Sequence, residues 1–199
     1  MISSVLRKIA VLANILYFLI KGVSFGSRLR VRGYVGLDLK RGSKITIGDN
    51  FVLLSGNMYN SIGRNIKSTL RADIDALITI GNNVGMSNVC IWSKCEIYIG
   101  NNVKIGADTI ILDSDMHSLD YLDRRDPKSD VANAKKNSVF VGDDAFIGTR
   151  CIINKGVRIG DRSIVASGSV VSKSIPSDEI WGGNPAKFIK YNTSDHGYS

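Results

Sequence analysis

The sequence predicts an all-β fold, a parallel β-helix shaped as a triangular prism with 18-residue coils, with an N-terminal helix and a short C-terminal tail. The first observation is a period of six without a slip, at Val141, Ile147, Ile153, Ile159, Val165 and Val171. The second is the small or turn-tolerant residue that follows each aliphatic one, at Gly142, Gly148, Asn154, Gly160, Ala166 and Ser172. A helix repeats every 3.6 residues and a strand every two, so a period of six fits a short strand followed by a tight turn.

Three such units close one coil, which predicts vertical stacks of Val141 on Ile159, Ile147 on Val165 and Ile153 on Val171. One coil cannot bury its own core, and stacking neighbouring coils buries it. The small residues are expected at the corners, where Gly accepts conformations that other residues resist.

The middle of the chain follows the same pattern with one slip. The phase continues from Ile80 through Met86 to Trp92, and again from Ile99 to Ile111, with one extra residue between Trp92 and Ile99. An earlier unit begins at Ile45, whereas residues 53–77 are irregular. These units predict a β-helix domain over residues 28–174.

Two segments leave the prism. Residues 113–138 form a polar interruption that is too long for a corner, and long loops on a rigid scaffold commonly carry function. After Lys173 the chain continues as a C-terminal tail, residues 175–199.

Residues 1–27 predict a separate apolar and basic helix. The run IAVLANILYFLI at residues 9–20 is shorter than the roughly 20 apolar residues that span a bilayer. Residues 1–44 contain nine basic residues against the single acid Asp38, whereas the basic and acidic residues of 45–199 cancel. This helix is expected to pack against the prism or a partner subunit, or to lie on an anionic membrane surface through residues 1–32.

Composition excludes several classes of function. Because the excess charge belongs to residues 1–44, the high net charge does not argue for a nucleic-acid-binding domain, which usually carries a basic stripe along its folded body. The chain has only two histidines, so no site with three imidazoles from one chain is possible, and no metal is expected. Three cysteines cannot pair off, which favours a reduced, cytoplasmic protein. The alternative for residues 1–32 places it peripherally at the inner face of the membrane.

The units of the form (I/V)-G-x-x-(A/V)-x-(I/V) resemble the hexapeptide-repeat acyltransferases. The segment Val170–Pro176 and the run Gly182-Gly183-Asn184-Pro185-Ala186-Lys187 are similar to the closing signature of the maltose, galactoside and capsular-polysaccharide O-acetyltransferases. The resemblance implies a left-handed β-helix, a homotrimer, acetyl-CoA as co-substrate, and transfer of an acetyl group to a hydroxyl of a sugar or glycan precursor.

The resemblance also implies roles for individual residues. His117, which opens the long loop, matches the general base, and His196 lies in a polar tail without repeat character. Neutral imidazole accepts a proton near physiological pH, as activation of a sugar hydroxyl requires. Asn88 matches a position that contacts the acceptor or intermediate, and either Asp113 or Asp115 is expected to orient the imidazole.

The expected coenzyme groove lies between neighbouring prisms. Phe146 points outward by the repeat phase, where relatives place an aromatic ring on the pantetheine arm. Corner backbone groups are expected to pair with the pantetheine amides, and basic side chains to face the phosphates. The corner residues are Gly148, Thr149, Ala166 and Ser167, and the basic ones are Lys173 and Lys187.

Two alternatives remain open. An amino-sugar N-acetyltransferase would use the same fold and co-substrate with an amine as acceptor. A non-catalytic structural β-helix would belong to a different class, and it would not need the histidine loop, the outward Phe146 and the Pro-Ala-Lys tail together.

Overall fold

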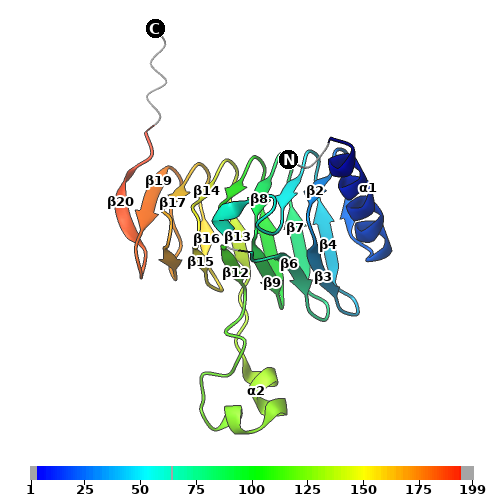
Figure 1. Cartoon of the computed structure of the whole chain (residues 1–199). Coiled ribbons are helices and arrows are strands. Elements are labelled where there is room, and N and C mark those ends of the chain that lie inside the picture. The colour runs from blue at the N-terminus through cyan, green and yellow to red at the C-terminus, as the bar shows by residue number, and fades with distance from the viewer. Residues whose placement is uncertain (1–3, 64, 194–199) are drawn as a thin grey trace.

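The chain folds as a three-sided prism of stacked coils with one helix at its N-terminal end (Figure 1). The computed structural model describes residues 4–63 and 65–193, with side chains from Ile9 onward. His196 therefore lies outside the described residues. The predicted all-β parallel architecture is confirmed, and the prism carries a long excursion on one edge.

Three sheets form the faces, and the chain visits them in the order A, B, C. Face A contains β1 (Ser24–Phe25), β4 (Lys44–Ile47), β7 (Leu77–Ile80), β10 (Glu96–Ile99), β13 (Val139–Val141) and β16 (Arg158–Ile159). Face B contains β2 (Arg30–Arg32), β5 (Val52–Leu54), β8 (Gly85–Ser87), β11 (Lys104–Ile105), β14 (Phe146–Ile147), β17 (Ile164–Val165), β19 (Glu179–Gly182) and β20 (Lys187–Tyr191). Face C contains β3 (Val35–Leu39), β6 (Ser68–Ala72), β9 (Cys90–Ser93), β12 (Ile110–Leu112), β15 (Ile152–Ile153) and β18 (Val170–Val171).

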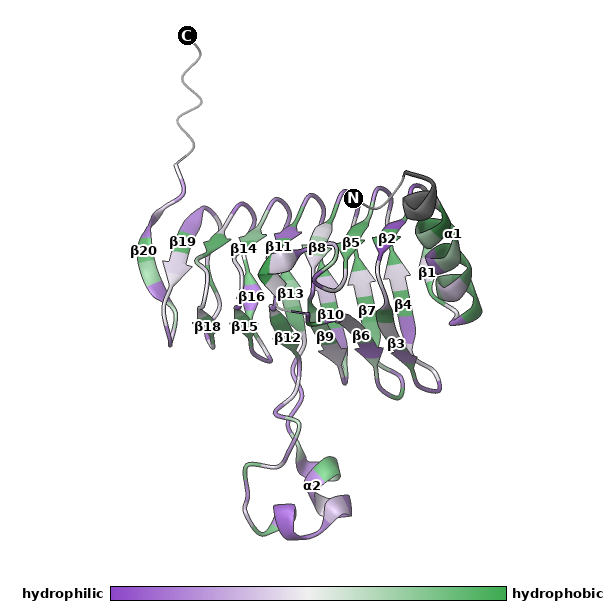
Figure 2. Ribbon diagram, viewed as in Figure 1, coloured by the Kyte–Doolittle hydropathy of each residue, from purple (hydrophilic) through white to green (hydrophobic). Residues whose placement is uncertain are grey.

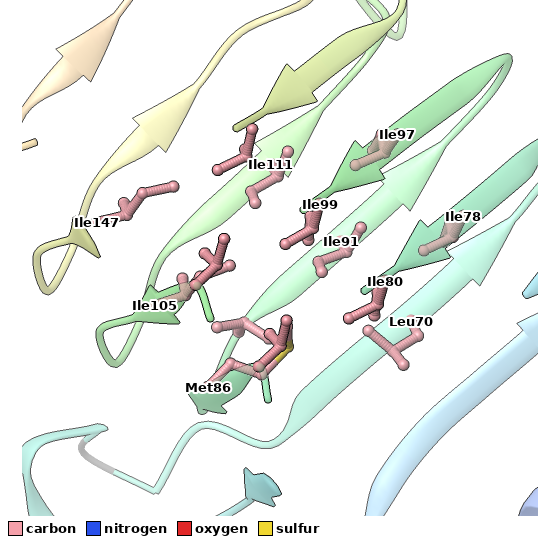
Figure 3. Packing of buried hydrophobic residues seen from close by; sticks show 14 of the residues in the cluster. Leu70, Ile78, Ile80, Met86, Ile91, Ile97, Ile99, Ile105, Ile111 and Ile147 are labelled. Atoms are coloured by element: carbon pink, nitrogen blue, oxygen red, sulfur yellow. The ribbon is translucent and has the colours of Figure 1, made fainter. Parts of the chain in front are cut away.

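The predicted stacks of aliphatic residues are confirmed by the strand register. Val141 pairs with Ile159, Ile147 with Val165 and Ile153 with Val171, each between parallel strands. All six side chains are buried. Figure 3 shows the same arrangement in earlier coils, where aliphatic side chains from successive strands point into one continuous core.

The phase at Trp92 is wrong by one residue. Ile91, which is fully buried, pairs with Ile111 and is the inward residue of β9. The corner after Met86 is one residue shorter than the six-residue period requires, so Trp92 faces outward. There the guanidinium of Arg71 lies 4.1 Å from its ring centroid.

Side-chain amides and carboxylates connect successive coils along the edge between faces A and B. The backbone N–H of Asp49 donates to Asn82 Oδ1 at 2.7 Å, and that of Asn82 donates to Asn101 Oδ1 at 2.9 Å. The ladder continues from Asn101 to Asp143 and from Asp143 to Asp161. The Gly that precedes Asn or Asp in each repeat lets the coils approach closely enough for these bonds.

The excursion at residues 113–138 leaves the edge between faces C and A. Its two arms are joined by the antiparallel bridge between Ser114 and Lys136. Beyond this neck it forms a 3₁₀ turn, η2 (Asp123–Arg125), and a short helix, α2 (Pro127–Asn133). A second loop follows β5 on the edge between faces B and C, and contains η1 (Ser61–Gly63).

The helix α1 (Ser4–Ile20) covers the N-terminal end of the prism (Figure 1). Its Phe18 is fully buried, and the side-chain amide of Asn14 donates to the carbonyls of Val31 and Gly33, both at 3.1 Å. The parallel strands begin at β1, before residue 28, and continue past residue 174 to β19, which pairs with β17. The tail then reverses, because β20 pairs antiparallel to β19.

Gly100→Ala tests the close approach of coils at the edge between faces A and B. An added Cβ would lie 2.3 Å from Asp143 Oδ1 and 3.0 Å from the backbone of Gly142. We expect the free energy of unfolding to fall by about 1–3 kcal/mol in denaturant titrations. Gly85→Ala is the matched control, because its Cβ meets only the flexible side chain of Lys104, and it should be neutral or slightly stabilising. Equal losses in both variants would contradict this account.

Candidate active site

His117 lies in the excursion, held by an acidic side chain of α2. Its Nδ1 lies 2.6 Å from Asp130 Oδ2, while Asp130 Oδ1 accepts a 2.7 Å hydrogen bond from the backbone N–H of Ser118. The side chain of His117 is 70% exposed, whereas that of Asp130 is 12% exposed. The carboxylate therefore anchors one edge of the imidazole and leaves the other edge facing outward.

Local sequence explains why α2 is in place to hold this histidine. Asp126 caps the helix by accepting from the backbone N–H of Ser129 at 2.9 Å, and Pro127 occupies the first turn, where a missing N–H costs nothing. Asp130 then lies one turn into the helix. Sequence reasoning missed Asp130; the Asp-Pro helix start was the signal that could have drawn attention to it.

The electrostatics of the pair favour one tautomer of His117. Hydrogen bonds from His117 and from the Ser118 N–H lower the pKa of Asp130, so its carboxyl group is ionised at neutral pH. An ionised carboxylate only accepts hydrogen bonds, so Nδ1 of His117 carries the proton. In the neutral ring, Nε2 is then left with a lone pair that can accept a proton.

The expectation that Asp113 or Asp115 orients the imidazole is wrong, because both carboxylates have other partners. Asp113 is fully buried. It accepts hydrogen bonds from the hydroxyl of Ser93 at 2.7 Å and from the backbone N–H groups of Lys94 and Cys95. It thus caps the corner of the preceding coil. Asp115 forms an ion pair with Lys155 at 2.8 Å.

Asn88 lies on a different edge of the prism from His117. It is buried at the corner between faces B and C and adopts a φ of 46°. Its side-chain oxygen accepts from the Gly56 N–H at 2.7 Å, and its amide donates to the carbonyl of Asn60 at 3.3 Å. The side chain therefore fastens the loop that follows β5, and one chain does not bring it together with His117.

Phe146 points outward from face B, as expected from the repeat phase, and is 48% exposed. It lines a groove of about 260 Å³ together with Lys104 and Gly106 of the preceding coil. An outward aromatic ring beside a groove is available to pack against an apolar ligand segment.

The four corner residues occupy successive turns between faces B and C. The N–H groups of Gly148 and Ala166 each donate to a carbonyl of the next coil at 2.8 Å, and the Thr149 N–H donates to the Ser167 hydroxyl at 3.2 Å. These three donors are therefore used inside the prism. The carbonyl of Gly148 accepts from the Thr109 hydroxyl and that of Ala166 from the Ser169 hydroxyl, so the hydroxyl hydrogen of Ser167 is what remains for a ligand at this edge.

The structure brings Lys173 and Lys187 together in one groove of about 260 Å³ near the C-terminal end of the prism. Trp181, which sequence reasoning did not single out, forms part of its wall, and its ring N–H donates to Glu179 at 2.6 Å. Two cations beside an indole ring form a site suited to phosphate groups attached to an aromatic base.

Across residues 4–63 and 65–193, no three His, Cys, Asp or Glu side chains are grouped closely enough to hold a metal ion. The three cysteines are free thiols.

The sequence is similar to known acetyltransferases. Residues 138–173 match the family model described as bacterial transferase hexapeptide (six repeats). Residues 138–173 thus carry the six-residue repeat of that family model. The chain is 29% identical over 138 residues to the galactoside O-acetyltransferase of Escherichia coli K12, covering 67% of this chain and 64% of that one. It spans between 33% and 47% of the length of two further curated relatives.

Solved structures agree on the fold. A hexapeptide-repeat-containing acetyltransferase from Vibrio cholerae matches with a TM-score of 0.58 and 24% identity, covering 91% of this chain and 81% of that one. The N-acyltransferase AntD from Bacillus cereus, in complex with dTDP and 3-hydroxybutyryl-CoA, matches with a TM-score of 0.63 and 17% identity, covering 91% and 88%. The prism is a left-handed parallel β-helix, an exception to the right-handed rule for parallel crossovers.

Proposed function

We propose that this protein is an acetyl-CoA-dependent O-acetyltransferase that acylates a hydroxyl of a sugar or glycan precursor. The observation that carries the proposal is the pairing of His117 Nδ1 with Asp130, which directs a basic Nε2 outward from the excursion. The similarity to galactoside O-acetyltransferase supports the class of acceptor.

The residues of the excursion suit general-base catalysis. His117 Nε2 accepts the hydroxyl proton as the hydroxyl oxygen forms a bond to the thioester carbonyl carbon. When the carbon–sulfur bond breaks, the imidazolium returns that proton to the thiolate sulfur. Asp130 keeps the ring in the tautomer that accepts the proton and stabilises the imidazolium that forms.

The proposed coenzyme site uses residues on face B, at its edge with face C, and after β18 near the C-terminal end of the prism. Lys173 and Lys187 face the phosphates as point charges, and Phe146 packs on the pantetheine arm. The Ser167 hydroxyl donates to an amide carbonyl of that arm. These groups together suit acetyl-CoA.

The site also requires a second copy of the chain in this proposal. The excursion projects away from its own prism at the edge between faces C and A (Figure 1). Phe146 lies on face B, and the corner residues lie at the edge between faces B and C. A threefold-symmetric homotrimer would bring the excursion of one subunit to the groove of the next. Closed symmetry of this kind is the usual arrangement for homo-oligomers.

A further proposed contact involves α1. Its outer side is lined by apolar side chains that are between 55% and 72% exposed, namely Ile9, Leu12, Leu16, Leu19 and Ile20. Lys21, Arg28 and Arg30 are exposed nearby, and Figure 2 shows the largely apolar helix at the end of the prism. Among the described residues, no helix is long and apolar enough to cross a bilayer. We therefore propose that α1 lies on anionic lipid at the inner face of the membrane, with the enzyme in the cytoplasm.

His117→Ala should lower kcat by at least about 10²-fold, because general-base assistance contributes roughly 10²–10⁴-fold. Thiol release from acetyl-CoA with a panel of sugar acceptors and amino-sugar acceptors measures it. His196→Ala is the control and should retain wild-type turnover. Asp130→Asn should lower kcat with little change in KM, because an amide does not enforce the required tautomer. Near-wild-type turnover of His117→Ala would exclude it as the base, and turnover of amines alone would indicate N-acetylation.

The proposed assembly predicts a particle with three times the 21.7 kDa chain mass in multi-angle light scattering. Because the proposed site takes its excursion and its groove from two different subunits, activity should fall on dilution if the trimer dissociates. An active particle with the mass of a single chain would contradict the shared site.

Leu12→Glu/Leu16→Glu tests the membrane contact without disturbing Phe18 and Asn14, which hold the helix on the prism. The wild-type protein should sediment with anionic phosphatidylserine vesicles, less so as salt rises, and the double variant should not. Leu119→Glu/Leu122→Glu is the matched control, because these exposed leucines lie in the excursion. Equal binding by both variants, or no binding by the wild type at low salt, would contradict the proposal.

A further inference from the structure

A cleft of about 330 Å³ opens where the excursion passes the corners of the N-terminal coils. Four cationic side chains line it, namely Lys40, Arg71, Lys94 and Lys136. The carboxylates near them are Asp73, in the wall, and Asp38, which contacts both Lys40 and Arg71. Four positive charges thus face two negative ones, so the cleft has a formal excess of two positive charges.

Half of the cations are already neutralised by internal ion pairs. Lys40 Nζ lies 3.0 Å from Asp38, and Arg71 Nε lies 2.9 Å from Asp73. The guanidinium of Arg71 also stacks on the ring of Trp92. These contacts hold the Arg71 guanidinium in one orientation, so little conformational freedom is lost when it receives a ligand.

The excess charge comes from Lys94 and Lys136. Across residues 4–63 and 65–193, neither ammonium has a carboxylate within ion-pair distance. The ammonium of Lys94 donates to the carbonyl of Met116 at 3.3 Å, and the side chain of Lys136 projects from the neck of the excursion. Two cations directed at one cleft without acidic partners can bind a ligand anion.

The cleft adjoins the proposed base on two sides. Met116, which Lys94 contacts, directly precedes His117. Val131, which forms part of the cleft wall, directly follows Asp130, the partner of the imidazole. A ligand held by these cations would therefore lie beside the segment that carries His117.

We propose that this cleft binds the anionic group of the acceptor, so that the protein prefers sugars that carry a phosphate or a carboxylate. The inference rests on the proposed acetyl transfer and names its substrate class. The coenzyme phosphates already have a separate cationic groove, at Lys173 and Lys187. The exposed side chains of Ile74 and Val131 form an apolar wall, against which the C–H groups on one face of a sugar ring can pack.

The test compares three acceptors that share one sugar ring: methyl galactoside, galactose 1-phosphate and galacturonate. With the full-length protein, kcat/KM should be at least about tenfold higher for an anionic acceptor than for methyl galactoside. The two anions distinguish a phosphate site from a carboxylate site. Lys94→Gln/Lys136→Gln should lower kcat/KM for the preferred anion about threefold to tenfold through KM, and lower it less for methyl galactoside. KM for acetyl-CoA should not change.

Lys128→Gln/Lys135→Gln is the matched control, because it removes the same net charge from the excursion outside the cleft. Equal losses in the two double variants, or a wild-type preference for methyl galactoside, would overturn the proposed cleft while leaving acetyl transfer intact.

Calorimetric titration with galactose 1-phosphate and galacturonate separates the two proposals. Binding that Lys94→Gln/Lys136→Gln weakens, without acetyl transfer to any acceptor, would support the cleft and contradict the enzymatic activity. A failure of both anions to bind the wild type would overturn the cleft.

Discussion

The whole molecule depends on contact between successive coils. Each inward aliphatic side chain lies on its equivalent one coil away, as Val141 lies on Ile159, and each strand obtains its hydrogen bonds from the strands above and below. No coil can bury its own core, so the prism is stable only as a stack. The helix α1 covers the first coil and the β19–β20 pair extends the last, which protects the ends of the stack.

Stacking also explains the restricted chemistry of the corners. The Gly and Asn or Asp residues at the edge between faces A and B let a side-chain oxygen accept the backbone N–H of the neighbouring coil. At the edge between faces B and C, the N–H groups of Gly148 and Ala166 likewise donate to carbonyls of the neighbouring coil. Backbone donors in such a fold are largely consumed by the fold itself, so polar chemistry has to come from side chains and from segments that leave the prism.

The excursion at residues 113–138 is that segment. A capped helix fixes Asp130, and Asp130 fixes His117, so the imidazole is oriented by a local structure standing on a rigid edge. Lys94 and Lys136, which have no carboxylate partner among the residues that the structure describes, lie at the foot of this segment. The excursion thus combines a base with a nearby excess of positive charge, whereas the apolar outer side of α1 lies at the N-terminal end of the prism.

The sequence alone determined the prism, its inward positions and its long excursion, because a period of six leaves little choice of which residues face the core. It placed Val141, Ile147 and Ile153 in their stacks and Phe146 on the outside. It misplaced Trp92, since a corner one residue short shifts the phase without leaving a periodic signal. Tertiary structure alone decided the partner of His117, because the contact with Asp130 spans thirteen residues of non-repeating chain. It likewise decided that Lys40, Arg71, Lys94 and Lys136 share one cleft, since stacked coils juxtapose residues that are far apart in the sequence.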